Sequence, residues 1–327
     1  MCIRDSHGLM IAGEAALSNW DAGMDMYIYG KLGNLIMTKE GINVLMTNLT
    51  GKVPPILQRL DYIRFNGEAA GYLHDLTLTG LFYTGAGMVK TDVMMSIDEQ
   101  SMSRTYSGSV ASADLDLGKL LNQEKKFGKV DFNVELKGFN YKNRYPESYI
   151  KGIISSFEYS QYQYENIMLD GVYKDGGFNG RLSMDDANGS VQIDGNFNVA
   201  KTIPDFNLKA SVKNLRPHDL HLSDKYENTS ISLGLTADFT GKSIDDMNGR
   251  ISLDSLQLNA PDERGCFLDN LTITAGQVSG EKELRINSSF MTAVIRGDYS
   301  YHTIPASVVK TVQRYIPSLL TIKDNMP

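Results

Sequence analysis

The chain has 327 residues, a formal net charge of −7, 42% hydrophobic residues and 22% charged residues. This is the composition of a folded protein, and the acidic balance without a Lys/Arg cluster argues against nucleic acid as a partner. Cys2 and Cys266 are the only cysteines, which excludes a disulfide framework and a cysteine zinc site. No run of 18 apolar residues and no signal peptide is readable, so the sequence predicts no transmembrane helix.

The first hundred residues begin with a segment that is foreign to the rest. Met1–Ser6 (MCIRDS) resembles translated adaptor sequence, and we expect it to be a non-native artefact that replaces the true N-terminus. Residues 7–106 are expected to form a partial first repeat, with strands at Ile63–Gly71 and Leu73–Gly80. Pro54–Leu60 predicts a helix of one or two turns.

Residues 107–206 and 207–304 are expected to be the second and third copies of a β repeat. Four segments recur in the same order, roughly one hundred residues apart. The matches are Ser109–Leu117 with Ser211–Leu222, Lys129–Gly138 with Ser230–Gly241, Lys151–Phe157 with Asn248–Leu256, and Tyr164–Tyr173 with Leu268–Gln277. Such a repeat predicts an elongated scaffold with one long surface, in contrast to a compact catalytic pocket.

Strict alternation of apolar and polar residues marks the strands of these copies. The clearest apolar positions are Val130, Phe132, Val134, Leu136, Val191, Ile193, Phe197, Ile231, Leu233 and Leu235. Strands with one wet and one apolar face are typical of antiparallel sheets. Asp175–Gly177 and Asp186–Gly189 predict hairpin turns, and a slip in the alternation between Leu253 and Leu256 predicts a bulge.

Helical signals are few. Asp116–Asn122 predicts a short helix, and Pro305–Leu320 predicts a longer one within residues 305–321, before a tail at 322–327. We therefore expect an all-β protein of roughly twenty strands. Because the helices cannot cover so large an apolar face, the sheet must form a sandwich, close into a barrel, or curl into a trough whose inner wall meets lipid acyl chains.

Several segments resemble a known family. Tyr164–Asn198, Leu115–Gly138 and Asn214–Tyr226 are similar to repeats of TamB-like proteins of the AsmA-like group, particularly Bacteroidota-type members. The resemblance implies an elongated, curved antiparallel sheet that forms a U-shaped trough, called a β-taco. It also implies a periplasmic location, an inner-membrane anchor, and a role in phospholipid transport between the membranes or in outer-membrane protein assembly. The chain would then be an internal fragment.

The same resemblance implies partners and the absence of catalysis. Phospholipid acyl chains would contact the apolar residues given above, which are our candidate groove residues. An outer-membrane assembly protein of the barrel type would bind through a C-terminal domain that the fragment lacks. The family has no catalytic residues to transfer, so we expect no enzyme and no cofactor.

Other features of the sequence leave alternatives open. An outer-membrane β-barrel or an extracellular β-sandwich adhesin also fits alternating strands. Phe157–Tyr164 (FEYSQYQY) predicts an amphipathic strand, whose aromatic residues could line the groove. His218 and His221 lack a third ligand and fit a surface loop, and Asp185–Gly189 fits a hairpin turn, so no metal site is expected.

Overall fold

The computed structural model describes residues 2–4, 8–19, 22–98, 100–101, 103–140, 147–224, 227–260, 266–298 and 300. The helix predicted at Pro305–Leu320 and the tail at 322–327 lie outside these residues. Of the helices described, none has the length and hydrophobicity that a membrane-spanning helix requires.

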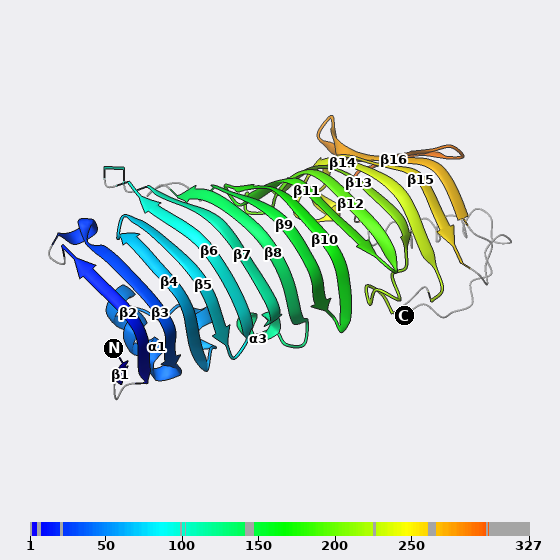
Figure 1. Ribbon diagram of the computed structural model, residues 1–327. Coiled ribbons are helices and arrows are strands. Elements are labelled where there is room, and N and C mark those ends of the chain that lie inside the picture. The colour runs from blue at the N-terminus through cyan, green and yellow to red at the C-terminus, as the bar shows by residue number, and fades with distance from the viewer. Residues whose placement is uncertain are drawn as a thin grey trace.

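One antiparallel sheet contains all the strands of the described residues (Figure 1). The strands are β1 Cys2–Arg4, β2 Leu9–Ser18, β3 Tyr27–Thr38, β4 Tyr62–Tyr72, β5 Asp75–Thr84, β6 Gly87–Ile97, β7 Arg104–Asp116, β8 Phe127–Asn140, β9 Glu147–Tyr159, β10 Tyr162–Lys174, β11 Gly177–Asp186, β12 Gly189–Asn198, β13 Asp205–Leu215, β14 Ser230–Thr240, β15 Asn248–Asn259, β16 Cys266–Val278, β17 Glu281–Ser288 and β18 Thr292–Arg296.

The topology is a simple meander, in which each strand pairs with the next one along the chain. Among the described residues, β18 pairs with neither β1 nor β2, so the sheet is open. The strands bow in the same sense, and the sheet is an elongated U-shaped trough (Figure 1). This confirms the predicted fold class and differs from both a closed barrel and a two-layer sandwich.

Alternation places apolar residues on one face of the trough, which we call the apolar face. Two rows of directly opposed residues cross it from β8 to β14. The first row is Phe132, Ile154, Ile167, Met184, Val191, Val212 and Leu233, and the second is Val134, Gly152, Leu169, Leu182, Ile193, Ala210 and Leu235. The opposite side, the polar face, carries residues such as Asn133 and Glu135.

Glycines on the apolar face allow neighbouring strands to approach closely where the sheet bends. Gly171, Gly180 and Gly195 oppose one another on β10, β11 and β12. A Cβ atom on Gly180 would lie 2.3 Å from the carbonyl oxygen of Asp170 and 2.4 Å from the Cα of Gly171. Because no side chain tolerates such distances, alanine at Gly180 would force these strands apart.

Three short helices cover one end of the apolar face. They are α1 Lys39–Thr50, α2 Pro55–Gln58 and α3 Leu117–Leu121, and Figure 1 shows α1 behind the strands, inside their curve. Their side chains complete the main core, which contains Ile42, Leu60, Ile63, Ala86, Leu115, Leu120 and Val130. Two 3₁₀ turns, Gly23–Asp25 and Ile244–Asp246, complete the helical structure of the described residues.

The helices at Pro54–Leu60 and Asp116–Asn122 are confirmed as α2 and α3, whereas α1 was not predicted. Thr38 caps α1 by accepting a hydrogen bond from the Gly41 N–H at 3.4 Å. Gly51 ends the helix in the left-handed conformation, with φ of 74°. Both features are ordinary helix boundaries, so the signal for α1 was present in the sequence.

The predicted turns at Asp175–Gly177 and Asp186–Gly189 are confirmed as the β10–β11 and β11–β12 hairpins. The predicted bulge is also confirmed. The β14–β15 register shifts opposite Ser255, which has a φ of 53°. The prediction of one strand over Phe157–Tyr164 was wrong, because Ser160 and Gln161 form a tight turn between β9 and β10. Their φ values of 51° and 64° fit a type I′ hairpin.

The recurring sequence segments lie on strands that are six positions apart in the sheet. The segments that begin at Ser109 and Ser211 fall on β7 and β13, and the next pair fall on β8 and β14. The remaining two pairs fall on β9 and β15 and on β10 and β16. Within the segment predicted to be an artefact, Cys2–Arg4 forms β1 and pairs with Met10–Ala12 of β2.

Candidate functional site

The candidate groove residues all lie on the apolar face. Phe132, Val191 and Leu233 share the first row, and Val134, Ile193 and Leu235 share the second. The other four occupy the same face: Val130 opposes Phe157, Leu136 opposes Ile150, Phe197 opposes Phe206, and Ile231 opposes Leu215. The sequence therefore predicted the side on which these residues lie, without predicting their neighbours across the strands.

Apart from the three helices, little of the described protein covers the apolar face. Of the ten candidates, only Val130 is buried, at 6% exposure, while Phe197 is 38% exposed and the others are half-buried. Burying apolar surface contributes about 25 cal/mol per Å², so covering the half-exposed apolar face with apolar groups would be favourable.

Aromatic rings line this face at two places. Phe178 and Phe197 on β11 and β12 have ring centroids 5.8 Å apart, and Phe206 and Phe239 on β13 and β14 stack at 4.8 Å. These four phenylalanines oppose one another from strand to strand and make an aromatic row beside the three glycines. Rings in such a row present broad, rigid apolar surface to an extended chain.

The second aromatic group surrounds the β9–β10 hairpin, where the sequence FEYSQYQY falls. Phe157 and Tyr164 are opposed on the apolar face, and the Tyr162 and Tyr164 rings are 4.8 Å apart. The Tyr164 hydroxyl donates a hydrogen bond of 2.7 Å to the carbonyl oxygen of Leu220, a fully buried residue. Burial and a hydrogen bond to Asp186 raise the pKa of Tyr162 to about 12. The hydrogen bond between Tyr164 and Leu220 holds the turn of residues 216–223 against the apolar face.

His221 belongs to this turn and lies against Ser160 and Tyr162. Its Nδ1 lies 2.8 Å from the carbonyl oxygen of Ser160, and its ring contacts Tyr162. His218 faces Asp219 and Glu227 at 3.5 and 3.9 Å. No group of three His, Cys, Asp or Glu side chains in the described residues is arranged to hold a metal ion.

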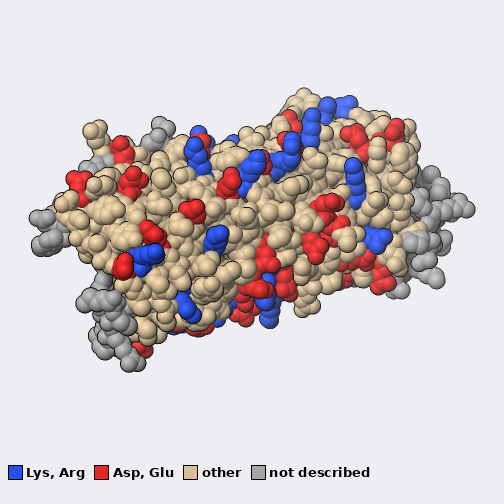
Figure 2. All heavy atoms as spheres, in the orientation of Figure 1, with Lys and Arg blue, Asp and Glu red and all other residues tan. Residues whose placement is uncertain are grey.

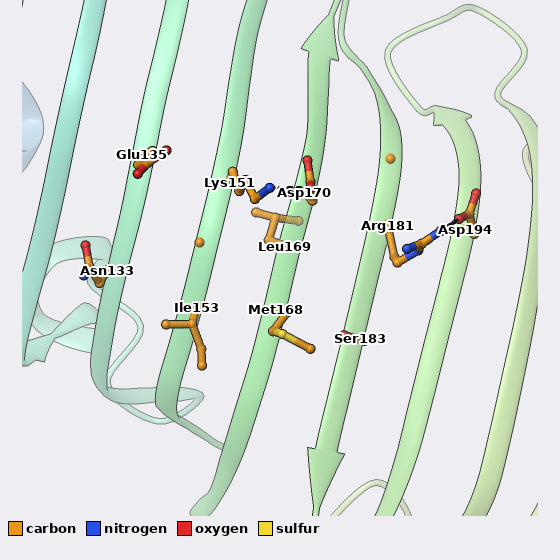
Figure 3. Close-up of a pocket in the computed structure, with 12 residues that line it drawn as sticks. Asn133, Glu135, Lys151, Ile153, Met168, Leu169, Asp170, Arg181, Ser183 and Asp194 are labelled. Atoms are coloured by element: carbon orange, nitrogen blue, oxygen red, sulfur yellow. Dashed lines mark hydrogen bonds and ion pairs between the residues drawn. The ribbon is translucent and has the colours of Figure 1, made fainter.

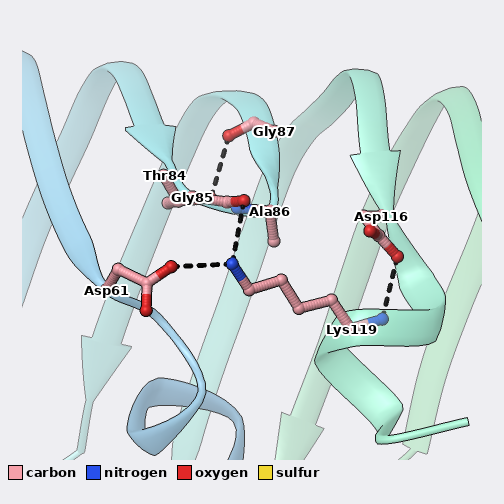
Figure 4. A network of polar contacts seen from close by, with 7 residues as sticks. All are labelled: Asp61, Thr84, Gly85, Ala86, Gly87, Asp116 and Lys119. Atoms are coloured by element: carbon pink, nitrogen blue, oxygen red, sulfur yellow. Dashed lines mark hydrogen bonds and ion pairs between the residues drawn. The ribbon is translucent and has the colours of Figure 1, made fainter. Parts of the chain in front are cut away.

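A polar network connects α3 to Asp61, which precedes β4, and to the turn between β5 and β6 (Figure 4). The Lys119 ammonium donates to Asp61 Oδ2 at 2.7 Å and to the Gly85 carbonyl at 3.2 Å, while Asp116 caps α3 through the Lys119 N–H. This ion pair lowers the pKa of Asp61 and raises that of Lys119. Arg59 also donates to the Leu120 carbonyl, so α2 and α3 form one cover.

The polar face carries a row of alternating charges and a shallow hollow of about 730 Å³ (Figure 3). From β8 to β13 the directly opposed residues are Glu135, Lys151, Asp170, Arg181, Asp194 and Lys209. Lys151 and Asp170 lie 3.4 Å apart, and Arg181 and Asp194 lie 2.9 Å apart. Opposite charges facing each other favour this register over a slipped one.

Figure 2 shows this polar side, where charges of both signs are spread among wide uncharged areas. A hydrogen bond from the Tyr149 hydroxyl, 2.9 Å long, is the main cause of the lowered pKa of Asp170. In the hollow, Lys151 is therefore paired with Asp170, and Arg181 with Asp194. The apolar wall is the better candidate for binding.

Comparison with known proteins gives no relative. No family model, no curated protein and no solved structure matches this chain. The case for a function therefore depends on the geometry of the sheet and on the sequence resemblance described above.

Proposed function

We propose that this chain is a segment of a periplasmic bridge whose apolar face carries phospholipid acyl chains between the inner and outer membranes. Its mechanism is passive: the acyl chains slide along the apolar wall while the headgroups stay in water. The observation that carries the proposal is the pair of apolar rows, which cross seven consecutive strands and remain half-exposed.

The physical fit between this wall and an acyl chain supports the proposal. Each buried methylene group contributes about 0.8 kcal/mol, and the contribution does not depend on direction. A continuous wall without polar interruption therefore gives a chain many positions of nearly equal free energy, which permits movement along the rows. A compact pocket would hold the chain at one position.

The proposal extends to the surroundings that the TamB-like resemblance implies. The segment acts in the periplasm within a protein anchored in the inner membrane, and an outer-membrane assembly protein of the barrel type is its partner. A role in outer-membrane protein assembly belongs to the same proposal, since an open apolar wall also accepts unfolded apolar segments. No nucleic acid, cofactor or catalysis is part of it.

Photocrosslinking tests the proposal directly. A benzophenone amino acid replaces Phe132, Phe197 or Leu233 on the apolar face, and Asn133 or Asn196 on the polar face as controls. The purified chain is mixed with vesicles of radiolabelled phospholipid and irradiated. We expect lipid adducts from the three apolar-face positions, several-fold above the controls.

The controls are matched because Asn133 and Asn196 lie on β8 and β12, beside Phe132 and Phe197 in sequence, with side chains on the opposite face. Equal labelling of both faces, or labelling of the polar face alone, would contradict the proposal. A complete lack of adducts from folded protein would contradict it as well.

A further inference from the structure

A second hollow lies on the polar face over strands β6 to β10, and we call it the Lys137 hollow. Its volume of about 470 Å³ falls within the roughly 300–1,000 Å³ that small-molecule sites occupy. Its lining includes four apolar side chains, one ammonium group and serine and threonine hydroxyls: Met94, Phe139, Tyr149, Val172, Lys137 and Ser107. Met94 is 48% exposed and Tyr149 is 37% exposed, so the hollow presents apolar surface on the otherwise polar side of the sheet.

The fold does not require apolar residues at these positions. One row of directly opposed residues crosses the polar face and changes character halfway. From β6 to β10 it is Met94, Ser107, Lys137, Tyr149 and Val172, and from β11 to β16 it is Asn179, Asn196, Asn207, Asp238, Arg250 and Thr274. The second half contains no apolar side chain, although its strands pair in the same way. Exposed apolar residues that the sheet does not need mark a surface for interaction.

The internal repeat provides a control for this comparison. Strands β8 to β10 correspond to β14 to β16, six positions further along the sheet. On the apolar face the corresponding positions stay apolar, as with Val134 of β8 and Leu235 of β14. In the row of the Lys137 hollow, Arg250 takes the place of Tyr149, and Asp238 takes the place of Lys137. The repeat therefore keeps the apolar face and lacks the hollow's lining in its next copy.

Lys137 brings a positive charge to the hollow without a counterion among the described residues. It is exposed and opposes Ser107 and Tyr149, neither of which is acidic. The other charged residue of the lining, Glu147, pairs with Lys174 at 2.7 Å. Glu135, two positions before Lys137, lines the adjoining hollow and opposes Lys151 on β9. The charge of Lys137 is thus available to an anionic ligand.

One wall of the hollow is already held in position. The Tyr149 hydroxyl donates a hydrogen bond of 2.9 Å to Asp170 on β10, which fixes the ring above the sheet. A ring that is ordered before binding loses little conformational freedom when a ligand packs against it. Its broad apolar surface suits a hydrocarbon body.

We propose that the Lys137 hollow binds an amphipathic carboxylic acid. The carboxylate accepts hydrogen bonds from the Lys137 ammonium and the Ser107 hydroxyl, and the apolar body packs over Met94, Tyr149 and Val172. A carboxylate carries the single negative charge that one ammonium balances, whereas a phosphate monoester carries nearly two. The site lies on the opposite face of the sheet from the proposed acyl-chain wall, so neither proposal depends on the other.

Photoaffinity labelling tests the site. The full chain is irradiated with decanoic acid that carries a terminal diazirine, below its micellar concentration, and adducts are located by mass spectrometry. We expect saturable adducts at Met94, Tyr149 and Val172 that unlabelled decanoate displaces. The corresponding photoreactive decanol lacks the charge and should label these positions about fivefold less.

Variants separate charge recognition from general apolar binding. Lys137→Gln is expected to weaken decanoate binding to the hollow about five- to tenfold, and Lys137→Glu should exchange the preference from decanoate to decylammonium. Lys90→Gln is the matched control, because Lys90 lies on the same face of β6 outside this lining, and it should leave binding unchanged. Val172→Thr should weaken binding about two- to threefold by making the wall more polar. Circular dichroism confirms that each variant is folded.

Adducts confined to the apolar face would assign the acid to the acyl-chain wall and overturn the proposal. Equal labelling by the acid and the alcohol, or equal losses for Lys137→Gln and Lys90→Gln, would show that Lys137 does not recognise the carboxylate. A folded chain without saturable adducts in the hollow would contradict the proposal as well. Adducts on both faces, with only those of the hollow lost in Lys137→Gln, would support it and leave the acyl-chain wall as a separate site.

Discussion

The two ends of the trough solve the same packing problem differently. From β3 to β8, helices α1, α2 and α3 cover the apolar face and produce a core of seven buried apolar residues. From β14 to β18 the comparable cluster among the residues described is smaller and contains Met247, Ala275 and Leu284. The strands alternate in the same way at both ends, so the difference arises from the connections between strands.

The two ends therefore differ both in stability and in how much apolar surface they expose. The covered end contributes more to stability, because seven apolar residues are buried there, whereas the uncovered end depends on cross-strand hydrogen bonds and half-buried contacts. Surfaces used for binding are commonly drawn from the less stable parts of a protein. The division is consistent with the proposed groove, since a fully covered wall would have no room for an acyl chain.

The largest expected effect comes from deleting core volume at the two ends. Ile42 of α1 is 1% exposed, and Ile42→Ala is expected to lower the free energy of unfolding by about 2–5 kcal/mol. Ile251 of β15 is half-buried, and the matched Ile251→Ala is expected to cost about 1–2 kcal/mol. Urea unfolding followed by circular dichroism measures both, and equal losses would contradict the comparison.

A smaller effect is expected where the turn of residues 216–223 is fastened to the wall. Tyr164→Phe removes the hydroxyl that donates to the Leu220 carbonyl and leaves that buried oxygen without this donor. The expected cost is about 1 kcal/mol. Tyr173→Phe on the same strand is the control, because Tyr173 is 41% exposed and a surface change there should stay within about 0.5 kcal/mol. Similar values for both variants would show that the turn is not held by this bond.

The fold could be predicted from the sequence because alternation and turn residues act locally. The faces of β8, β12 and β14 follow from period-two patterns alone, as does the bulge at Ser255. Helix α1 was not predicted although Ile42, Leu45, Met46 and Leu49 have helical spacing, because its weak helix formers, among them Gly41 and Thr47, lower its helix propensity.

The arrangement across strands could not be predicted in the same way. That Phe132, Val191 and Leu233 share one row depends on the register of six successive pairings. Two of these contain register shifts, β8–β9 between Asp131 and Phe132 and β13–β14 between Val212 and Leu215. Each bulge or change in turn length changes which residues face each other on neighbouring strands. The row of Glu135, Lys151 and Asp170 was invisible for the same reason, since charged partners are separated by whole hairpins in the sequence.

The smallest expected effect concerns acid, and it compares one carboxylate from each end. Glu283 on β17 accepts hydrogen bonds from Arg285 at 3.0 Å and Arg296 at 2.6 Å, which lower its pKa below the usual 4.5. Asp61 at the covered end has its pKa lowered by Lys119 from the usual 3.8. A carboxylate whose pKa is lowered by folding stabilises the folded state fully above its unfolded pKa, and that contribution is lost as pH falls through the folded pKa.

We therefore expect the stability difference between the wild type and Glu283→Gln to be constant near neutral pH and to shrink as pH falls below about 4.5. The difference for Asp61→Asn should shrink only at lower pH, because aspartate has the lower unfolded pKa. Hydrogen exchange of β17–β18 and of α3 from pH 6 to 3 follows each site locally. If both differences stayed constant across this range, neither ion pair would contribute to acid sensitivity. If Glu283 alone responded, β17–β18 would loosen first in acid, while the helix-covered end, whose stability rests on buried apolar contacts, would persist.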